Sequence, residues 1–254
     1  MAAVAPAVKI RLEKVSKAFG DKVVLDGLDL EVATGDTVVI LGGSGTGKSV
    51  LLKHVIGLLR PDSGRVIVDD VDLATLDERE ITSFRRRFGM AFQEGALFDS
   101  MTVWENVAFP LQRAKRPRAE IEARVAECLA SVHLDGAERK MPSELSGGMR
   151  RRVGFARAIA LEPEILLFDE PTTGLDPVIK AVIDGLILEL QEGLGSTALV
   201  ITHDLDSAFR IADRIAFLYR GRIVANAPPQ EFRDLPDPRV QQFIQGLATG
   251  PLTD

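Results

Sequence analysis

Residues 42–49 have the types and the spacing that phosphate binding needs. They are Gly42, Gly43, Ser44, Gly45, Thr46, Gly47, Lys48 and Ser49, which fit the pattern G-x-x-x-x-G-K-[ST] without a mismatch. The glycines allow successive backbone N–H groups to turn towards an anion. Lys48 supplies a point charge for the β- and γ-phosphates, and Ser49 offers a hydroxyl to a hard cation such as Mg²⁺. A glycine-rich loop that binds nothing is the alternative.

A second group of polar residues follows apolar stretches elsewhere in the chain. Asp169 and Glu170 end the stretch 164–168, which is apolar from Ile165 to Phe168. A carboxylate there can hold Mg²⁺ directly or through water, and Glu170 is placed to polarise an attacking water. One such carboxylate alone can be a helix cap or a turn residue. Two in a row, in a chain that already has a phosphate loop, indicate catalysis.

His203 and Gln93 are weaker candidates. His203 ends the apolar run 197–202, and Gln93 ends the run 88–92. A lone histidine at a strand end is more often structural, and a glutamine there is unremarkable. Beside a strand that ends in Asp169, however, we expect His203 to contact a γ-phosphate and Gln93 to bridge the metal or the water.

The elements around residues 42–49 have the order that the phosphate loop requires. The β-branched run 37–41 predicts a buried strand, and residues 50–59 have helical apolar spacing. The start of that helix adds its positive end to the site. Phe19 lies in a connection between two expected early strands. It can stack on a purine base, or it can be a lone surface or core aromatic.

The pattern of elements predicts an α/β fold. Alternating residues in 8–18 and 23–32 indicate an antiparallel edge, and later strands separated by helices indicate a parallel core with its site at the carboxyl edge. Charged helices in between predict a helical subdomain of about 94–142, which extends into a helix at 146–160. We expect one domain over residues 8–246 and a loose tail at 247–254.

Composition limits the classes of protein that the chain can belong to. It has 254 residues, 46% of them hydrophobic, and a net charge of −6. That charge argues against a nucleic-acid partner. Cys128 is the only cysteine, so no intrachain disulfide can form and a reducing compartment is expected. The start of the chain is no convincing signal peptide, and no apolar run approaches the ~18 residues of a membrane span. Membrane contact would therefore come through partners.

With these motifs in order, the chain resembles the nucleotide-binding subunit of ABC transporters over nearly its whole length. Beyond the phosphate loop, the resemblance rests on the Q-loop glutamine Gln93, the signature Leu145-Ser146-Gly147-Gly148, the strand 165–169 with Glu170, the D-loop 173–176 and the switch histidine His203. A phosphate loop alone leaves many NTPases open, but the signature together with the histidine is highly specific.

The resemblance implies a P-loop NTPase fold and ATP hydrolysis with Mg²⁺ in a homodimer. It implies catalytic roles for Glu170, His203, Lys48 and Gln93, and metal binding by Ser49, Gln93 and Asp169. Phe19 would stack on adenine, and residues 42–49 would hold the phosphates. Ser146, Gly147 and Gly148 begin a helix whose N–H groups favour an anion, and by resemblance they contact the γ-phosphate of the nucleotide held by the opposite subunit.

Two residues depart from the family pattern. Met149 stands where most members have glutamine, and Phe19 stands where tyrosine is commoner. Phenylalanine keeps the aromatic face, so stacking survives. Met149 loses a polar side chain but leaves the donors at the helix start intact.

Three segments resemble the ATPase of Mla-type, MCE-linked phospholipid transporters, namely residues 92–111, 141–149 and 237–243. That resemblance implies lipid transport between the inner and outer membranes, with integral-membrane permease subunits and an MCE-domain protein. The ATPase would act at the cytoplasmic face of the bacterial inner membrane. In the family, the segment after the Q-loop receives a helix of the membrane subunit. Phe98, Met101 and Trp104 are candidate contacts, and packing within the helical subdomain is an equal alternative for each.

Other functions remain to be weighed. The nearest rival is the ATPase of an importer for amino acids or other small polar solutes. A soluble ABC ATPase acting on DNA or ribosomes usually carries a long coiled coil or two ATPase domains, and this sequence has neither. An inactive interaction module would not need Lys48, Asp169, Glu170 and His203 together.

Overall fold

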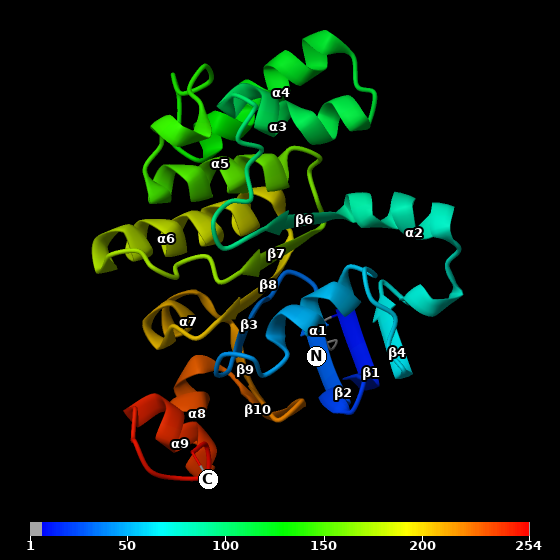
Figure 1. Ribbon diagram of the computed structural model, residues 1–254, viewed down its shortest axis with the longest axis vertical. Coiled ribbons are helices and arrows are strands. Elements are labelled where there is room, and N and C mark those ends of the chain that lie inside the picture. The colour runs from blue at the N-terminus through cyan, green and yellow to red at the C-terminus, as the bar shows by residue number, and fades with distance from the viewer. Residues whose placement is uncertain (1–6, 254) are drawn as a thin grey trace, which may run out of the picture. The chain divides into compact units, whose positions relative to one another are not determined.

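Two long strands with alternating polar and apolar residues open the structure. β1 (Val8–Phe19) and β2 (Lys22–Ala33) pair antiparallel, with Phe19 opposite Lys22 beside the turn. Figure 1 shows the computed structural model, which describes residues 7–253. The chain divides into a first unit of residues 1–75 and 201–254 and a second unit of residues 76–200. The apolar start of the chain at residues 1–6, and residue 254, lie outside the described residues.

The first unit combines antiparallel and parallel strand pairing. One sheet has the order β2-β1-β4-β5, and a second group of strands runs β10-β9-β3. The remaining elements are β3 (Thr37–Leu41), α1 (Lys48–Val55), β4 (Ser63–Val68), β5 (Val71–Asp72), the 3-10 turn η1 (Leu73–Thr75), α7 (Leu205–Ile211), β9 (Arg214–Tyr219), β10 (Arg222–Ala227), α8 (Pro229–Arg233) and α9 (Pro238–Gln245).

Local sequence accounts for the strands next to the phosphate loop. All five residues of β3 are buried, and β3 runs parallel to β9 with Val39 opposite Ile215. A strand buried on both faces reads as a continuous apolar run. β9 and β10 form a hairpin, in which Arg220 and Gly221 both have positive φ, at 46° and 77°. Two such residues suit the turn that joins twisted antiparallel strands.

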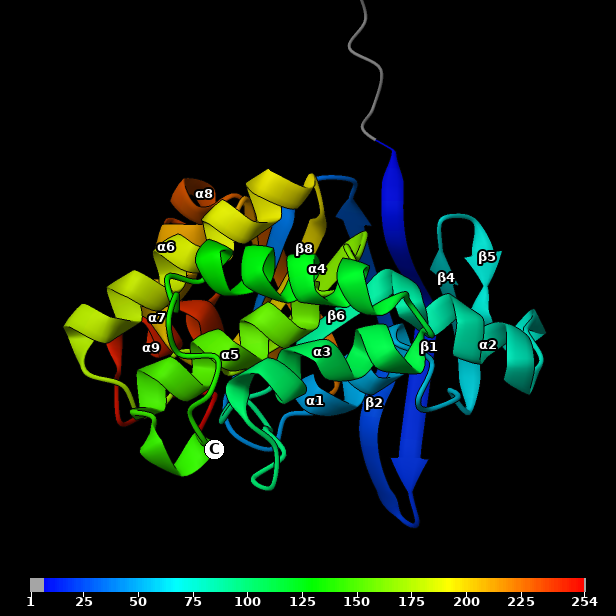
Figure 2. The same cartoon turned by 90° about the horizontal axis from the view of Figure 1, so that it is seen from above.

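The second unit combines helices with a further group of strands. Its strands run in the order β8-β7-β6, and β6 is parallel to β7. Helices α3, α4 and α5 pack together, as the green ribbons in Figure 2 show. The elements are α2 (Glu78–Phe84), η2 (Arg85–Arg87), β6 (Phe88–Ala91), α3 (Val103–Arg113), α4 (Arg118–Ser131), η3 (Pro142–Glu144), α5 (Gly147–Ile159), β7 (Ile165–Asp169), α6 (Pro177–Leu194) and β8 (Thr197–Thr202), which leads into the first unit.

The predicted fold class is confirmed, since the structure is a mixed α/β fold. Sequence reasoning missed α3, although its start carries a clear signal. Thr102 accepts a hydrogen bond from the Glu105 N–H, and Glu105 reaches back to the Thr102 N–H, which is the capping box that Thr-x-x-Glu predicts. Pro110 inside the helix hides the helical pattern.

The segment after residue 246 is held by hydrogen bonds, whereas we expected a loose tail. The buried Gln242 side chain donates to the Leu247 carbonyl over 3.1 Å and accepts from the Leu252 N–H over 2.8 Å. The Tyr219 hydroxyl donates to the Pro251 carbonyl over 2.7 Å. These bonds fasten the segment to α9 and β9. Within residues 7–253, no helix has both the length and the apolar character that a bilayer crossing requires.

Candidate active site

The phosphate loop, residues 42–49, joins β3 to α1 in the first unit. Lys48 is the first residue of α1, and its side chain is buried. Its ammonium donates to the carbonyl oxygens of Gly42 over 2.7 Å and Gly43 over 2.9 Å, while the Thr46 hydroxyl donates to Gly43 over 2.9 Å. The loop therefore wraps around the Lys48 ammonium and holds this charge at the start of the helix.

Two glycines of this loop are required by their surroundings. Gly47 has a φ of 105°, and a Cβ there would lie 3.0 Å from Val24 Cγ1. A Cβ on Gly42 would lie 2.7 Å from the carbonyl oxygen of Leu218. The strands on either side leave no room for a side chain, so the backbone of the loop is fixed in a shape that only glycine allows.

The start of α1 is arranged to receive an anion. Gly47 is its N-cap and provides no side-chain cap, so the first N–H groups lack the usual side-chain acceptor. Ser49 is exposed in the first turn of α1, and its hydroxyl oxygen is a ligand of the kind that Mg²⁺ prefers. Beside the loop, a cavity of about 340 Å³ has the size of small-molecule sites. Its walls include Val24, residues 44–46 and Arg220.

Phe19 lies at the tip of the β1–β2 hairpin, whose residues Val24 and Leu25 are the contacts of Gly47. Phe19 is 50% exposed, and the Lys17 ammonium lies 5.6 Å from the centroid of its ring. Lys17 is itself held by Asp62 over 2.6 Å. An exposed ring on a hairpin that packs against the phosphate loop is compatible with base stacking, which stays a prediction.

His203 follows β8 in the first unit and is exposed. Its two neighbours fix the backbone around it. The Asp204 N–H donates to the Thr202 hydroxyl over 3.0 Å, and the Asp204 carboxylate caps α7 by accepting from the Ser207 N–H over 3.1 Å. The chain therefore turns sharply at His203, and a short capped helix follows.

In the second unit, β7 ends at Asp169, and Glu170 follows it directly. Glu170 has a φ of 51°, a left-handed conformation that is uncommon for a residue with a side chain. Its carboxylate accepts a hydrogen bond of 2.9 Å from the Thr173 hydroxyl. Backbone strain of this kind concentrates at functional sites. Residues 170–173 are named here the Glu170 loop. A hydrogen bond inside this loop therefore fixes the position of the Glu170 carboxylate.

Gln93 is exposed and begins the Gln93 loop, residues 93–96. Its carbonyl oxygen accepts a hydrogen bond of 2.7 Å from Arg151 Nε. Arg157 donates to the carbonyl oxygens of Gly95 over 2.7 Å and Ala96 over 2.8 Å. Gly95 has a φ of 78° and touches α5 so closely that a Cβ there would lie 2.6 Å from the Arg150 carbonyl. The Gln93 loop is therefore bound to α5 along its length.

The signature segment, residues 145–148, forms the start of α5. The Ser146 hydroxyl caps this helix by accepting from the Met149 N–H over 3.3 Å. A Cβ on Gly148 would lie 3.0 Å from Ile179 Cγ2, so this glycine packs against the start of α6. The cap uses the backbone N–H of Met149, so it does not depend on the side chain at that position.

The structure groups the predicted residues by unit. The first unit contains the phosphate loop, Phe19 and His203, and the second contains Gln93, Asp169, Glu170 and the signature segment. Within residues 7–253, no group of three or more His, Cys, Asp and Glu side chains is placed to bind a metal. Ligation of one Mg²⁺ by Ser49, Gln93 and Asp169 stays a prediction. Sequence reasoning missed Arg151 and Arg157, because their role depends on contacts distant in the chain. It named Thr173 only as part of the D-loop 173–176, without its hydrogen bond to Glu170.

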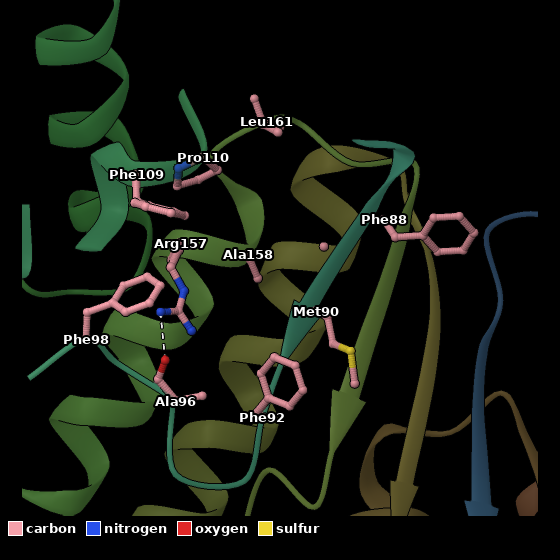
Figure 3. A pocket seen from close by; sticks show the side chains of 11 residues that line it. Phe88, Met90, Phe92, Ala96, Phe98, Phe109, Pro110, Arg157, Ala158 and Leu161 are labelled. Atoms are coloured by element: carbon pink, nitrogen blue, oxygen red, sulfur yellow. Dashed lines mark hydrogen bonds between the residues drawn. The ribbon is translucent and has the colours of Figure 1, made fainter. Parts of the chain in front are cut away.

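An apolar pocket of about 360 Å³, named here the Phe98 pocket, opens between β6, the Gln93 loop and helices α3 and α5. Figure 3 shows the Phe98 and Phe109 rings near the Arg157 guanidinium. The two ring centroids are 4.8 Å apart, and Arg157 lies 5.6 Å from the Phe98 centroid. Phe98 lines this pocket, whereas Met101 and Trp104 are not among its lining residues. That any of the three contacts a partner stays a prediction.

Comparisons with known proteins agree with this arrangement. The family model described as "ABC transporter" matches residues 25–173. The chain is 41% identical to the "Intermembrane phospholipid transport system ATP-binding protein MlaF" of Escherichia coli, over 96% of this chain and 91% of that protein. It is 42% identical to the "Probable ribonucleotide transport ATP-binding protein mkl" of Mycobacterium tuberculosis, over 96% of this chain and 68% of that one.

Solved structures show the same fold. CbiO1 from Clostridium perfringens, part of the ABC transporter complex cbiONQ, has a TM-score of 0.83 and 30% identity, over 94% of this chain and 99% of that chain. The dimeric bacterial ABC transporter cassette MJ0796 has a TM-score of 0.79 and 35% identity, over 87% and 98%. That cassette has also been solved as a dimer in a post-hydrolysis state bound to ADP and Pi.

Proposed function

We propose that this chain, which belongs to the ABC transporter family, is the ATP-hydrolysing subunit of a bacterial transporter that moves phospholipids between the inner and outer membranes. As a member of this family it is an ATPase. The observation that carries the lipid assignment is the 41% identity to MlaF over nearly the full length of both chains. Permease subunits and an MCE-domain protein complete the proposed assembly, which places this chain at the cytoplasmic face of the inner membrane.

The proposed chemistry is in-line attack of water on the γ-phosphate of ATP. Lys48, held at the start of α1, neutralises phosphate charge, and the N–H groups of the phosphate loop orient the nucleotide. Glu170 polarises the water, and His203 contacts the γ-phosphate. A bound Mg²⁺, held by Ser49, Asp169 and Gln93, would supply further charge neutralisation. Phe19 stacks on the adenine.

Each site also needs a second copy of the chain. Ser146, Gly147 and Gly148 present a helix start whose donors suit an anion. In the proposed homodimer they contact the γ-phosphate of the nucleotide held by the partner. The dimeric structures of the MJ0796 cassette, one of them with hydrolysis products, support this arrangement.

The Phe98 pocket is the proposed docking site for a permease helix. It is apolar, it is rimmed by the exposed rings of Phe92 and Phe98, and it lies beside the Gln93 loop. We expect Phe98→Ala to release the chain from its membrane partner while the ATPase rate of the isolated chain is kept. Leu58→Ala is the matched control, because Leu58 is a similarly exposed apolar residue of the first unit. Equal retention of Phe98→Ala and wild type on the permease contradicts the docking site.

The lipid assignment is tested by purifying the tagged chain from native membranes in mild detergent. We expect an integral-membrane permease, an MCE-domain protein and bound phospholipid in the complex. A second candidate is transport of a small polar solute, because the mycobacterial relatives are named for ribonucleotide transport. Recovery of a solute permease with no MCE-domain protein supports that candidate and rejects lipid transport.

A further inference from the structure

Arg151 is a buried arginine that binds two loops of the second unit at once. It lies in the second turn of α5, and its side chain is almost wholly buried. Its Nε donates to the carbonyl oxygen of Gln93 over 2.7 Å, and its Nη2 donates to the carbonyl oxygen of Thr173. The planar guanidinium has donors on separate branches, so it can hold two acceptors in a fixed relation.

Thr173 extends this connection to Glu170. Its hydroxyl donates to the Glu170 carboxylate over 2.9 Å, and its N–H donates to the Glu170 carbonyl over 3.4 Å. The Glu170 backbone adopts the left-handed region, which persists only where surrounding contacts maintain it. A continuous set of hydrogen bonds therefore runs from the Gln93 carbonyl through Arg151 and Thr173 to the Glu170 carboxylate.

The Arg151 guanidinium carries its positive charge in a buried position, which is unusual for an arginine. Burial is the main cause that lowers the pKa of the Arg151 guanidinium, and the charge of Glu94 acts in the opposite direction. Two backbone carbonyls, rather than a carboxylate pair, are its hydrogen-bond acceptors at close range. A buried charge is costly without such acceptors. Arg151 therefore depends on the positions of both loops, just as they depend on Arg151.

Arg157, an arginine of the same helix, contacts the Gln93 loop but not the Glu170 loop. It binds Gly95 and Ala96 of the Gln93 loop and lies over the Phe98 ring. Both arginines attach the Gln93 loop to α5, and a Cβ on Gly154 would lie 2.8 Å from Gly95 Cα, so helix and loop are closely packed. Arg151 differs from Arg157 because it also reaches the Glu170 loop.

We propose that Arg151 is a positioning residue for ATP hydrolysis, which sets Gln93 and the Glu170 carboxylate relative to the signature helix α5. The inference rests on the proposed roles of Gln93 and Glu170. Because α5 begins at the signature segment, a shift of this helix when nucleotide is bound in the dimer is passed to both loops through one side chain. Displacements of about 1 Å at a catalytic group can change rates by about 100-fold.

The test measures ATP turnover by Arg151→Gln and Arg151→Lys in the full-length chain. Glutamine is too short to donate to the carbonyls of both Gln93 and Thr173. Lysine keeps the charge but lacks the planar guanidinium with donors on separate branches. We expect kcat to fall about 10- to 100-fold for Arg151→Gln and less for Arg151→Lys, with KM for ATP changed less than about twofold. Melting temperature and Mg²⁺-ATP binding are measured on the same samples.

Arg124→Gln is the matched control. Arg124 also donates to two backbone carbonyls, those of Ile159 over 2.9 Å and Ala160 over 3.2 Å, but it binds neither of the two loops. We expect its kcat to stay within about twofold of wild type. If Arg151→Gln and Arg124→Gln lose stability to the same extent and neither loses kcat, Arg151 is only a structural residue and the proposal is overturned.

Thr173 variants test the same connection from its other end, so the proposal is testable even where Arg151→Gln does not fold. Thr173→Val removes the hydroxyl donor to Glu170 at nearly constant volume, and Thr173→Ser keeps it. We expect kcat to fall for valine and to recover for serine. Equal rates for the two variants contradict the connection. Glu170→Gln tests the proposed function separately, because full ATPase activity in that variant rejects the role of Glu170 itself.

Discussion

The phosphate loop and the Gln93 loop both shape the proposed active site, but they are held in different ways. The hydrogen bonds that hold the phosphate loop come from within it, because its own carbonyl oxygens accept from the Lys48 ammonium. The Gln93 loop is held by Arg151 and Arg157, which come from a helix more than fifty residues further along the chain. The first loop is therefore encoded locally, and the second depends on tertiary packing.

The largest effect is expected from a substitution in the phosphate loop, the loop that is encoded locally. Lys48→Ala removes the charge at the start of α1, and we expect ATP turnover to fall by at least about 100-fold, the effect of losing one well-placed electrostatic group. Turnover and nucleotide binding are measured with purified protein. Lys53→Ala is the control, because Lys53 is an exposed lysine of the same helix. Wild-type turnover in Lys48→Ala contradicts the assignment of the loop.

A smaller effect is expected where the Gln93 loop depends on packing. Gly154→Ala places a Cβ 2.8 Å from Gly95 Cα and must push the loop away from α5. We expect a loss of about 1–3 kcal/mol in the free energy of unfolding, typical of overpacking, and a reduced kcat. Denaturant unfolding and ATPase assays measure both.

Gly185→Ala is the control for that substitution. Gly185 lies inside α6, and a Cβ there meets nothing within 4 Å. Alanine is the better helix former by about 1 kcal/mol, so this variant should be at least as stable as wild type. If Gly154→Ala is as stable and as active as Gly185→Ala, the loop is not held by close packing.

A modest pH effect is expected at Asp237, the cap of α9 in the first unit. Hydrogen bonds from Arg239 hold the pKa of the Asp237 carboxyl at about 2, below its ordinary 3.8. A depressed native pKa stabilises the fold above the unfolded value, and this stabilisation is lost as the pH falls from about 4 towards 2. Asp237→Asn keeps a good cap but removes the charge.

The difference between wild type and Asp237→Asn isolates that charge. We expect wild type to be more stable by up to about 1 kcal/mol at pH 6, because the pair is partly exposed, and the difference to shrink below pH 4. Urea unfolding at several pH values measures it. If the difference in unfolding free energy between wild type and Asp237→Asn is constant from pH 6 to pH 2.5, the ionisation of Asp237 does not contribute to stability.

The smallest effect concerns the thiol reactivity of Cys128, which lies in the helical core of the second unit. Burial raises the pKa of the Cys128 thiol to about 11 and removes it from solvent. The thiolate is the reactive form, so we expect thiol reagents to label native protein at pH 8 only very slowly and unfolded protein rapidly. Labelling at the same rate in buffer and in denaturant would show that α4 is not packed as described.

The same contrast explains how much the sequence could predict. Gly42 to Ser49 were identified from spacing alone, because the strand, the loop and the helix follow one another along the chain. Asp169 and Glu170 were placed at a strand end by an apolar run. Arg151 carries no local pattern, since its guanidinium meets the carbonyls of Gln93 and Thr173 only after α5, β6 and β7 have packed. Helix α3 had a capping signal at Thr102, but Pro110 obscured it.

The measurement that tests the account most directly is the mass of Glu170→Gln in solution with and without Mg²⁺-ATP. This variant keeps the phosphate loop and the signature segment but lacks the carboxylate proposed to polarise water. Light scattering should show twice the 27.6 kDa of one chain when ATP is present, and one chain without it. A variant that stays monomeric at saturating ATP, or a wild-type monomer that hydrolyses ATP at full rate, would contradict a site shared between two copies.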